Sequence, residues 1–106
     1  MTTRRFVYPV LADTFIRREQ VIAQGKVIRF VVQLEIESSR QSKAQPVIRY
    51  DTAHGFIHID RYNMKGEQRK ERLAIMDFNQ ALTLAEQDIV RNWPMYREKF
   101  LQGEFP

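Results

Sequence analysis

The chain has 106 residues, of which 43% are hydrophobic and 28% charged, with 17 Lys and Arg against 13 Asp and Glu. These values are typical of one folded domain over residues 1–106 and exclude a disordered or fibrous chain. The absence of cysteine excludes disulfides, thiol nucleophiles and thiolate metal sites. No apolar run approaches the roughly 20 residues that cross a bilayer, so we expect a cytoplasmic protein without membrane contact. The net charge of +4 suits a polyanionic partner.

The first predicted hairpin covers residues 14–36. Apolar residues alternate with mostly polar ones along its second strand: Ile28, Phe30, Val32, Leu34 and Ile36. This period of two indicates a strand with one buried face. A two-residue turn at 24–25 pairs it with residues 14–23, which places Val21 opposite Ile28 and Phe15 opposite Leu34.

The second predicted hairpin follows a loop over residues 38–45. Its turn at 52–55 sets apolar residues opposite apolar residues on one face of the sheet. On the other face, the same register sets Arg49 opposite His58. The alternation therefore predicts a second, polar face.

A third turn ends at Gly66, where glycine supplies the positive φ of a short hairpin loop. This turn adds a further strand next to the second hairpin. It aligns Arg72 with His58 and Lys70 with Asp60, so two more basic residues join the polar face.

A helix is predicted after the last strand. Asp77 and Gln80 have the spacing of a capping box, and apolar residues recur at helical spacing over residues 78–101. Pro94 is expected to kink or restart this helix, because proline removes a backbone donor and clashes with the preceding turn. The predicted fold class is α+β: an antiparallel meander of about five strands with a C-terminal helix, kinked near Pro94, packed on one face.

Both histidines of the chain, His54 and His58, fall within residues 49–62, which is the most concentrated chemical signal in the sequence. The predicted register places His58 on the sheet face away from the helix, among mostly basic residues. That face is predicted to gather Arg49, Asp51, His58, Asp60, Tyr62, Lys70 and Arg72, with Arg18 and Arg29 from the first hairpin.

We predict two kinds of site residue on this face. His58 is the candidate general acid or base, and Asp60, two positions along the strand, orients its imidazole. His54 and Asp51 complete the candidate catalytic set. Guanidinium groups bind phosphodiesters and aromatic rings stack on bases, so the candidate phosphate-binding or RNA-binding residues are Arg49, Arg72, Lys70, Arg29 and Tyr62.

The same residues allow simpler interpretations. The charged residues can form a solvated sheet face with cross-strand ion pairs. His54 precedes Gly55 in a tight turn, where histidine tolerates an unusual backbone conformation. Asp51 is a good turn opener whose side chain caps the loop backbone.

A metal site is a further alternative. His54, His58, Asp51 and Asp60 carry ligand types that suit several divalent ions, but their spacing matches no metal signature and nearby arginines oppose a cation. We therefore expect no metal and no cofactor. The sequence also contains no glycine-rich phosphate loop and no nucleophile elbow, which excludes the usual motifs of nucleotide hydrolysis and acyl transfer.

The segment R-Y-D-T-A-H-G-F-I-H at 49–58, the helical N-Q-A-L-T at 79–83 and N-W-P at 92–94 resemble a small uncharacterised prokaryotic family over about residues 27–101. The central hairpin and the following helix are also similar to TumE-type toxins of toxin-antitoxin pairs. This resemblance implies a toxin-like protein that acts on RNA and is neutralised by an antitoxin protein. The positions that match are Tyr50, Asp51, His54, Gly55 and His58, which adds Tyr50 to the candidate RNA-binding residues.

Two functions follow as hypotheses. The first is an RNA-directed toxin, a metal-independent ribonuclease centred on His58. The second is a noncatalytic module that binds nucleic acid or an acidic protein through the same face. This face also has apolar residues that suit a homodimer: Val27, Val31, Val47 and Phe56. A structural domain, solubilised by its charges, is the third alternative.

Overall fold

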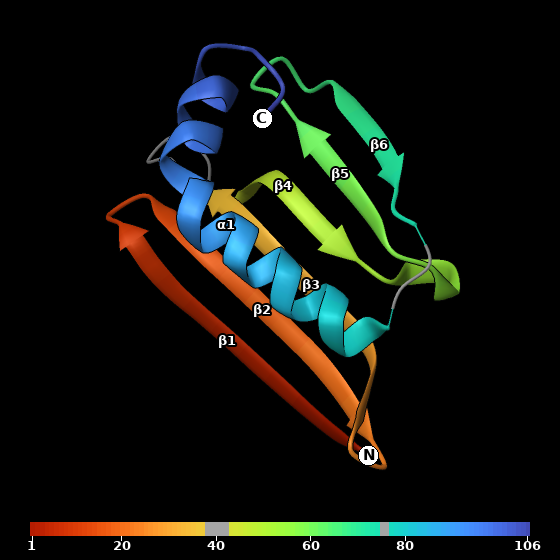
Figure 1. The fold of residues 1–106 in the computed structure, drawn as a ribbon. Coiled ribbons are helices and arrows are strands. Elements are labelled where there is room, and N and C mark those ends of the chain that lie inside the picture. The colour runs from red at the N-terminus through yellow and green to blue at the C-terminus, as the bar shows by residue number, and fades with distance from the viewer. Residues whose placement is uncertain (38–42, 75–76) are drawn as a thin grey trace.

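The computed structural model describes residues 1–37, 43–74 and 77–106, so most of the predicted loop at 38–45 lies outside the described residues. The elements in chain order are β1 (Thr2–Leu11), β2 (Thr14–Ala23), β3 (Lys26–Ile36), β4 (Gln45–Asp51), the 3-10 turn η1 (Ala53–Gly55), β5 (His58–Tyr62), β6 (Gln68–Arg72) and α1 (Phe78–Leu101). The strands form one antiparallel sheet in the order of the chain (Figure 1). The predicted α+β meander is confirmed, with β1 as a sixth strand.

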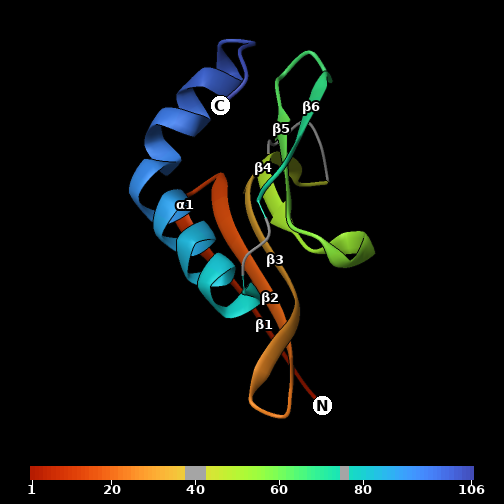
Figure 2. The same ribbon diagram turned by 45° about the vertical axis from the view of Figure 1, so that its right-hand side comes forward.

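Helix α1 covers one face of the sheet, and within the described residues no element covers the other (Figure 2). The alternating apolar side chains of β3 from Phe30 to Ile36 are buried in the core that α1 shares, and Val32 and Leu34 are fully buried. Ala85 and Ile89 of α1 are fully buried as well, and all belong to one core. Within the described ranges, no helix combines the length and the hydropathy of a membrane-crossing segment.

A β-bulge at Ile28 changes the register of the first hairpin. Ile22 pairs with Val27 next to the turn, but Val21 pairs with Arg29, so Ile28 is an extra residue on β3. Such an insertion shifts every later pair by one position. The predicted pairing of Val21 with Ile28 is therefore wrong.

The same bulge reverses the faces of β2. Ile16, and not Phe15, lies opposite Leu34, so the even-numbered residues of β2 face the helix. Arg18 was predicted on the polar face, but its guanidinium contacts the carboxylate of Glu86 on α1. A one-residue shift exchanges the two faces of a strand, which is the physical reason for this correction.

The turn between β4 and β5 is longer than predicted. It contains η1, and Asp51 pairs with His58 while Arg49 pairs with Asp60. The predicted pair of Arg49 with His58 is therefore displaced by two residues. A two-residue shift keeps each side chain on its face, so the predicted polar face survives the change.

The turn at Gly66 is as predicted, with a φ of 83° at the glycine. His58 pairs with Arg72 and Asp60 with Lys70 across β5 and β6. These two pairs confirm the predicted register of the third hairpin. They extend the polar face to the edge of the sheet.

Helix α1 begins after Asp77, whose carboxylate accepts hydrogen bonds from the backbone N–H groups of Asn79 at 2.7 Å and Gln80 at 3.3 Å. This is the predicted N-cap. The helix runs through Pro94 to Leu101 as one element, so it does not restart. The predicted kink takes the form of a bend in the axis between the two halves of α1 (Figure 2).

Asp88 of α1 ties the helix to the sheet. Its carboxylate accepts hydrogen bonds from the hydroxyl groups of Tyr50 and Tyr96, each at 2.6 Å, and from the amide of Asn92 at 2.8 Å. Burial raises the pKa of Tyr96 from 10.0 to about 12, and the hydrogen bond to Asp88 adds to the shift. Burial and Asp88 raise the pKa of Tyr50 in the same direction. Both tyrosines are therefore held in the neutral form.

These tyrosines predict a loss of stability in alkaline solution. Tyrosine ionises near pH 10 in the unfolded chain, whereas Tyr96 stays protonated to higher pH in the folded protein. Its contribution is complete below about pH 10 and is lost between about pH 10 and pH 12. Urea unfolding across this range should show a smaller loss of stability for Tyr96→Phe than for the wild type. Equal losses in the two proteins would contradict this role of Tyr96.

Candidate functional site

The sheet face away from α1 carries two rows of paired residues that cross all six strands. One row consists of Arg5, Glu19, Val31, Asp51, His58 and Arg72, and the next of Val7, Arg17, Gln33, Arg49, Asp60 and Lys70. We call the charged and amide residues of these rows, with Arg29 and Glu35 of β3, the polar face. Most residues that the sequence predicted for this face are thereby brought together.

Asp51 is the centre of contacts on the polar face. Its Oδ2 accepts a hydrogen bond from Nε of Arg49 at 2.8 Å, and its Oδ1 accepts one from the backbone N–H of Ala53 at 2.9 Å. Oδ1 also lies 2.6 Å from Nε2 of His58. Asp51 therefore both opens the turn, as the simpler interpretation expected, and contacts the candidate catalytic histidine.

His58 is enclosed on this face, with 8% of its surface exposed. Its Nδ1 lies 3.7 Å from Oδ2 of Asp60, and in the described structure neither Nδ1 nor Oδ1 of Asp60 has a hydrogen-bond partner. The ring of Phe56 packs 5.5 Å from the imidazole, and the guanidinium of Arg72 lies 4.2 Å from the centre of the Phe56 ring. Both ring nitrogens of His58 thus face carboxylates.

Four other predicted residues take no part in these contacts. His54 is exposed in η1 with a φ of 67°, which fits its conformational interpretation. Tyr50 lies on the helix side of the sheet, where Asp88 binds its hydroxyl, and not on the polar face. Val47, predicted to be available for a homodimer, is fully buried. Tyr62 is half-buried at the end of β5, where burial raises its pKa.

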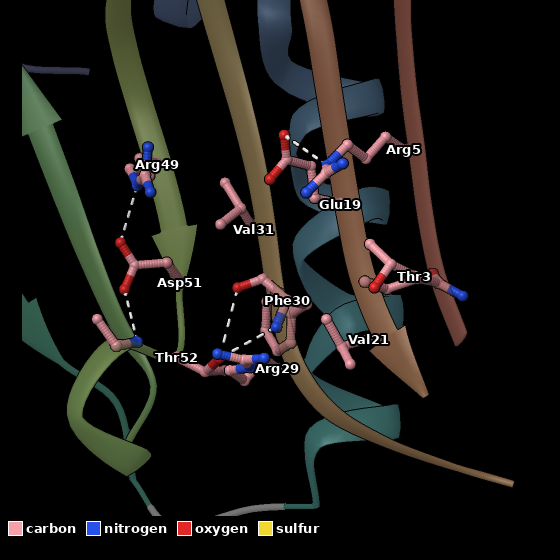
Figure 3. Close-up of a pocket in the computed structure, with 12 residues that line it drawn as sticks. Thr3, Arg5, Glu19, Val21, Arg29, Phe30, Val31, Arg49, Asp51 and Thr52 are labelled. Carbon is pink, nitrogen blue, oxygen red and sulfur yellow. Dashed lines mark hydrogen bonds and ion pairs between the residues drawn. The ribbon is translucent and has the colours of Figure 1, made fainter. Parts of the chain in front are cut away.

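An open hollow of about 400 Å³ lies on the polar face beside Asp51. Figure 3 shows that its arginines come from three strands: Arg5 from β1, Arg29 from β3 and Arg49 from β4. Arg29 is exposed and, within the described residues, has no ion pair or hydrogen bond. Arg5 was not predicted as a site residue, because strand β1 was not predicted. The run of β-prone residues Phe6 to Tyr8 was the available signal.

Three acidic residues of the polar face, Glu35, Asp51 and Asp60, are buried, whereas Glu19 is half-buried. The exposed fraction of the side chain is 7% for Asp51 and 37% for Arg49, which binds it. Likewise it is 4% for Glu35 and 35% for Arg17, whose Nε donates to Glu35 at 2.8 Å. Solvent therefore meets mainly guanidinium groups, and the polar face presents an outer layer of positive charge.

The whole chain, residues 1–106, belongs to the family described as Domain of unknown function (DUF7718). The prediction of an uncharacterised family is thereby confirmed. No curated protein and no solved structure matches the chain. The resemblance to TumE-type toxins stays a prediction.

Proposed function

We propose that this protein binds single-stranded RNA through the polar face, with phosphate groups in the hollow bordered by Arg5, Arg29 and Arg49. The observation that supports this proposal is the layering of charge. The carboxylates of Glu35 and Asp51 are buried and paired with the more exposed Arg17 and Arg49, so a ligand meets these guanidinium groups first. Family membership names no function, and the proposal therefore rests on this geometry.

Arg29 is the residue best suited to a phosphate. Its guanidinium is exposed, it lines the hollow, and within the described chain no carboxylate occupies it. Arg49, by contrast, already donates to Asp51 and to the side-chain oxygen of Gln33 at 3.2 Å. One guanidinium group can donate two parallel hydrogen bonds to a phosphate. Arg29 is free to do so, and Arg49 lines the same hollow as a second cationic group.

The open sheet face favours a single strand over a duplex. Single-stranded RNA lies along sheet surfaces, where its bases contact side chains and its phosphates contact basic residues. Phe56 and Tyr62 supply aromatic rings on the same face. The planar guanidinium of Arg72 lies over the Phe56 ring and adds a further flat, cationic group. A helix-free face with basic and planar groups is therefore suited to such a ligand.

Binding is better supported than cleavage. A general acid or base must direct a ring nitrogen at the reacting group, whereas both nitrogens of His58 face Asp51 and Asp60. Metal-independent cleavage by His58 stays a prediction of the sequence. The binding proposal requires no proton transfer from it.

The test is RNA binding measured by fluorescence anisotropy in EDTA, with a single-stranded oligonucleotide at several salt concentrations. Arg29→Glu should weaken binding at least about tenfold and reduce the salt dependence by about one phosphate contact. The matched control is Arg91→Glu, an exposed residue of α1 with the same change of charge. Equal effects of the two variants, or no binding by the wild type, would overturn the proposal. Cleavage of the oligonucleotide in EDTA would restore the ribonuclease hypothesis.

A further inference from the structure

Three acidic residues of the polar face are buried: Glu35, Asp51 and Asp60. Within the described structure, Asp60 alone of the three has no hydrogen bond. It is 4% exposed, its Oδ1 has no partner, and its one ion-pair contact among the described residues is that of Oδ2 with Nδ1 of His58. A buried carboxylate without a compensating partner is strongly unfavourable. A positive centre in contact with Asp60 compensates this cost.

The contact between His58 and Asp51 defines which nitrogen of His58 is free. Nε2 of His58 lies 2.6 Å from Oδ1 of Asp51, and two such atoms approach this closely only with a proton between them. In the neutral imidazole, Nδ1 then carries a lone pair. This lone pair is on the nitrogen that lies near Oδ2 of Asp60.

The separation of Nδ1 and Asp60 favours a metal ion over a proton at this position. At 3.7 Å the two atoms are too far apart for a hydrogen bond. An ion about 2.1 Å from each atom bridges that separation at an angle somewhat wider than tetrahedral. One ligand atom from each of Asp51, His58 and Asp60 lies within 4.8 Å of the others, and all three residues are buried.

The two nearby arginines are held by groups other than Asp60 and Nδ1 of His58. The guanidinium of Arg49 binds Asp51 through Nε, and that of Arg72 lies over the ring of Phe56. The charge of Arg49 is thus balanced by Asp51. From sequence alone both charges counted against a metal, because these contacts cannot be read from it.

We propose that Nδ1 of His58 and the carboxylate of Asp60 bind a divalent transition-metal ion beneath the polar face, with Asp51 orienting the imidazole through Nε2. A carboxylate that holds the second nitrogen of a ligating histidine is a common arrangement in metal sites. The mixed nitrogen and oxygen donors favour zinc over magnesium, which prefers oxygen alone. His54 is exposed in η1 and takes no part.

The probe is Zn²⁺ alone, added to the untagged full chain after treatment with EDTA. Long-range ¹H–¹⁵N spectra of the imidazoles report the state of each ring nitrogen. Only two histidines contribute, and His54→Gln assigns them. We expect the Nδ1 signal of His58 to shift and saturate at one equivalent of Zn²⁺, while Nε2 stays protonated. An unchanged His58 in excess Zn²⁺, or a response confined to His54, would overturn the proposal.

Calorimetric titration of variants tests the ligands separately. Asp60→Asn should weaken Zn²⁺ binding more than about 100-fold, and Asp51→Asn by about 10 to 100-fold. Glu19→Gln is the matched control, because it removes the same charge from the same face outside the cluster. Wild-type affinity in Asp60→Asn would also overturn the proposal. The wild-type spectra remain decisive if a variant does not fold, and RNA binding in EDTA is independent of both results.

Discussion

Replacing Asp51 with alanine is expected to lower the free energy of unfolding by about 3–5 kcal/mol. The change removes the carboxylate that Arg49, Ala53 and His58 contact from three directions. It leaves a buried imidazole and a backbone N–H without their partner, which costs more than the loss of an exposed ion pair. Urea unfolding followed by circular dichroism measures the difference from the wild type.

Glu19→Ala is the control for this prediction. Glu19 lies in the same row of the sheet, but it is half-buried and its contacts with Arg5 and Arg17 are both 3.8 Å long. Partly exposed ion pairs of this kind contribute about 0–1 kcal/mol. Similar losses of stability for Asp51→Ala and Glu19→Ala would contradict the central position of Asp51.

Replacing Asp88 with alanine is expected to cost about 2–4 kcal/mol, because two buried tyrosine hydroxyls lose their acceptor. Tyr50 comes from β4 and Tyr96 from a later turn of α1, so one carboxylate connects the helix to the sheet. The measurement is again urea unfolding. Gln87→Ala, an exposed neighbour on the same helix, should change stability by less than about 0.5 kcal/mol. A neutral effect of Asp88→Ala would show that the hydroxyls find other partners.

The parts of the fold that were predicted from sequence are those with a local signal. The alternation of apolar residues in β3 directly reports burial on one face, and Leu34 is fully buried as expected. Asp77 caps α1 because the capping pattern depends on only a few neighbouring residues. The pairing of His58 with Arg72 followed from the length of one short turn.

The features that were missed depend on contacts between distant segments. The bulge at Ile28 leaves the alternation on each side intact, so nothing local shows that the pairing has shifted. Strand β1 is an edge strand that is almost entirely exposed, and it therefore lacks a buried face to create a period of two. Asp88 has the appearance of an ordinary surface residue of a helix until Tyr50 is placed opposite it.

Only the part of the candidate site that depends on neighbouring residues was predicted. Residues two apart on a strand share a face, so His58 and Asp60 were correctly expected together. The hollow is lined by Arg5, which comes from a strand that was not predicted, and by Arg29, which directly follows the bulge at Ile28. Burial of the carboxylates beneath the arginines is a property of the assembled sheet and has no signature in the sequence.

The most direct test of RNA binding by the polar face is a map of amide chemical shifts. The wild-type protein, in EDTA, is titrated with single-stranded RNA until binding saturates. We predict that the largest changes fall on β3 and β4 around Arg29, Arg49 and Asp51, while the exposed side of α1 near Arg91 is unchanged. Changes centred on α1, or no changes on the polar face at saturation, would contradict the proposed function.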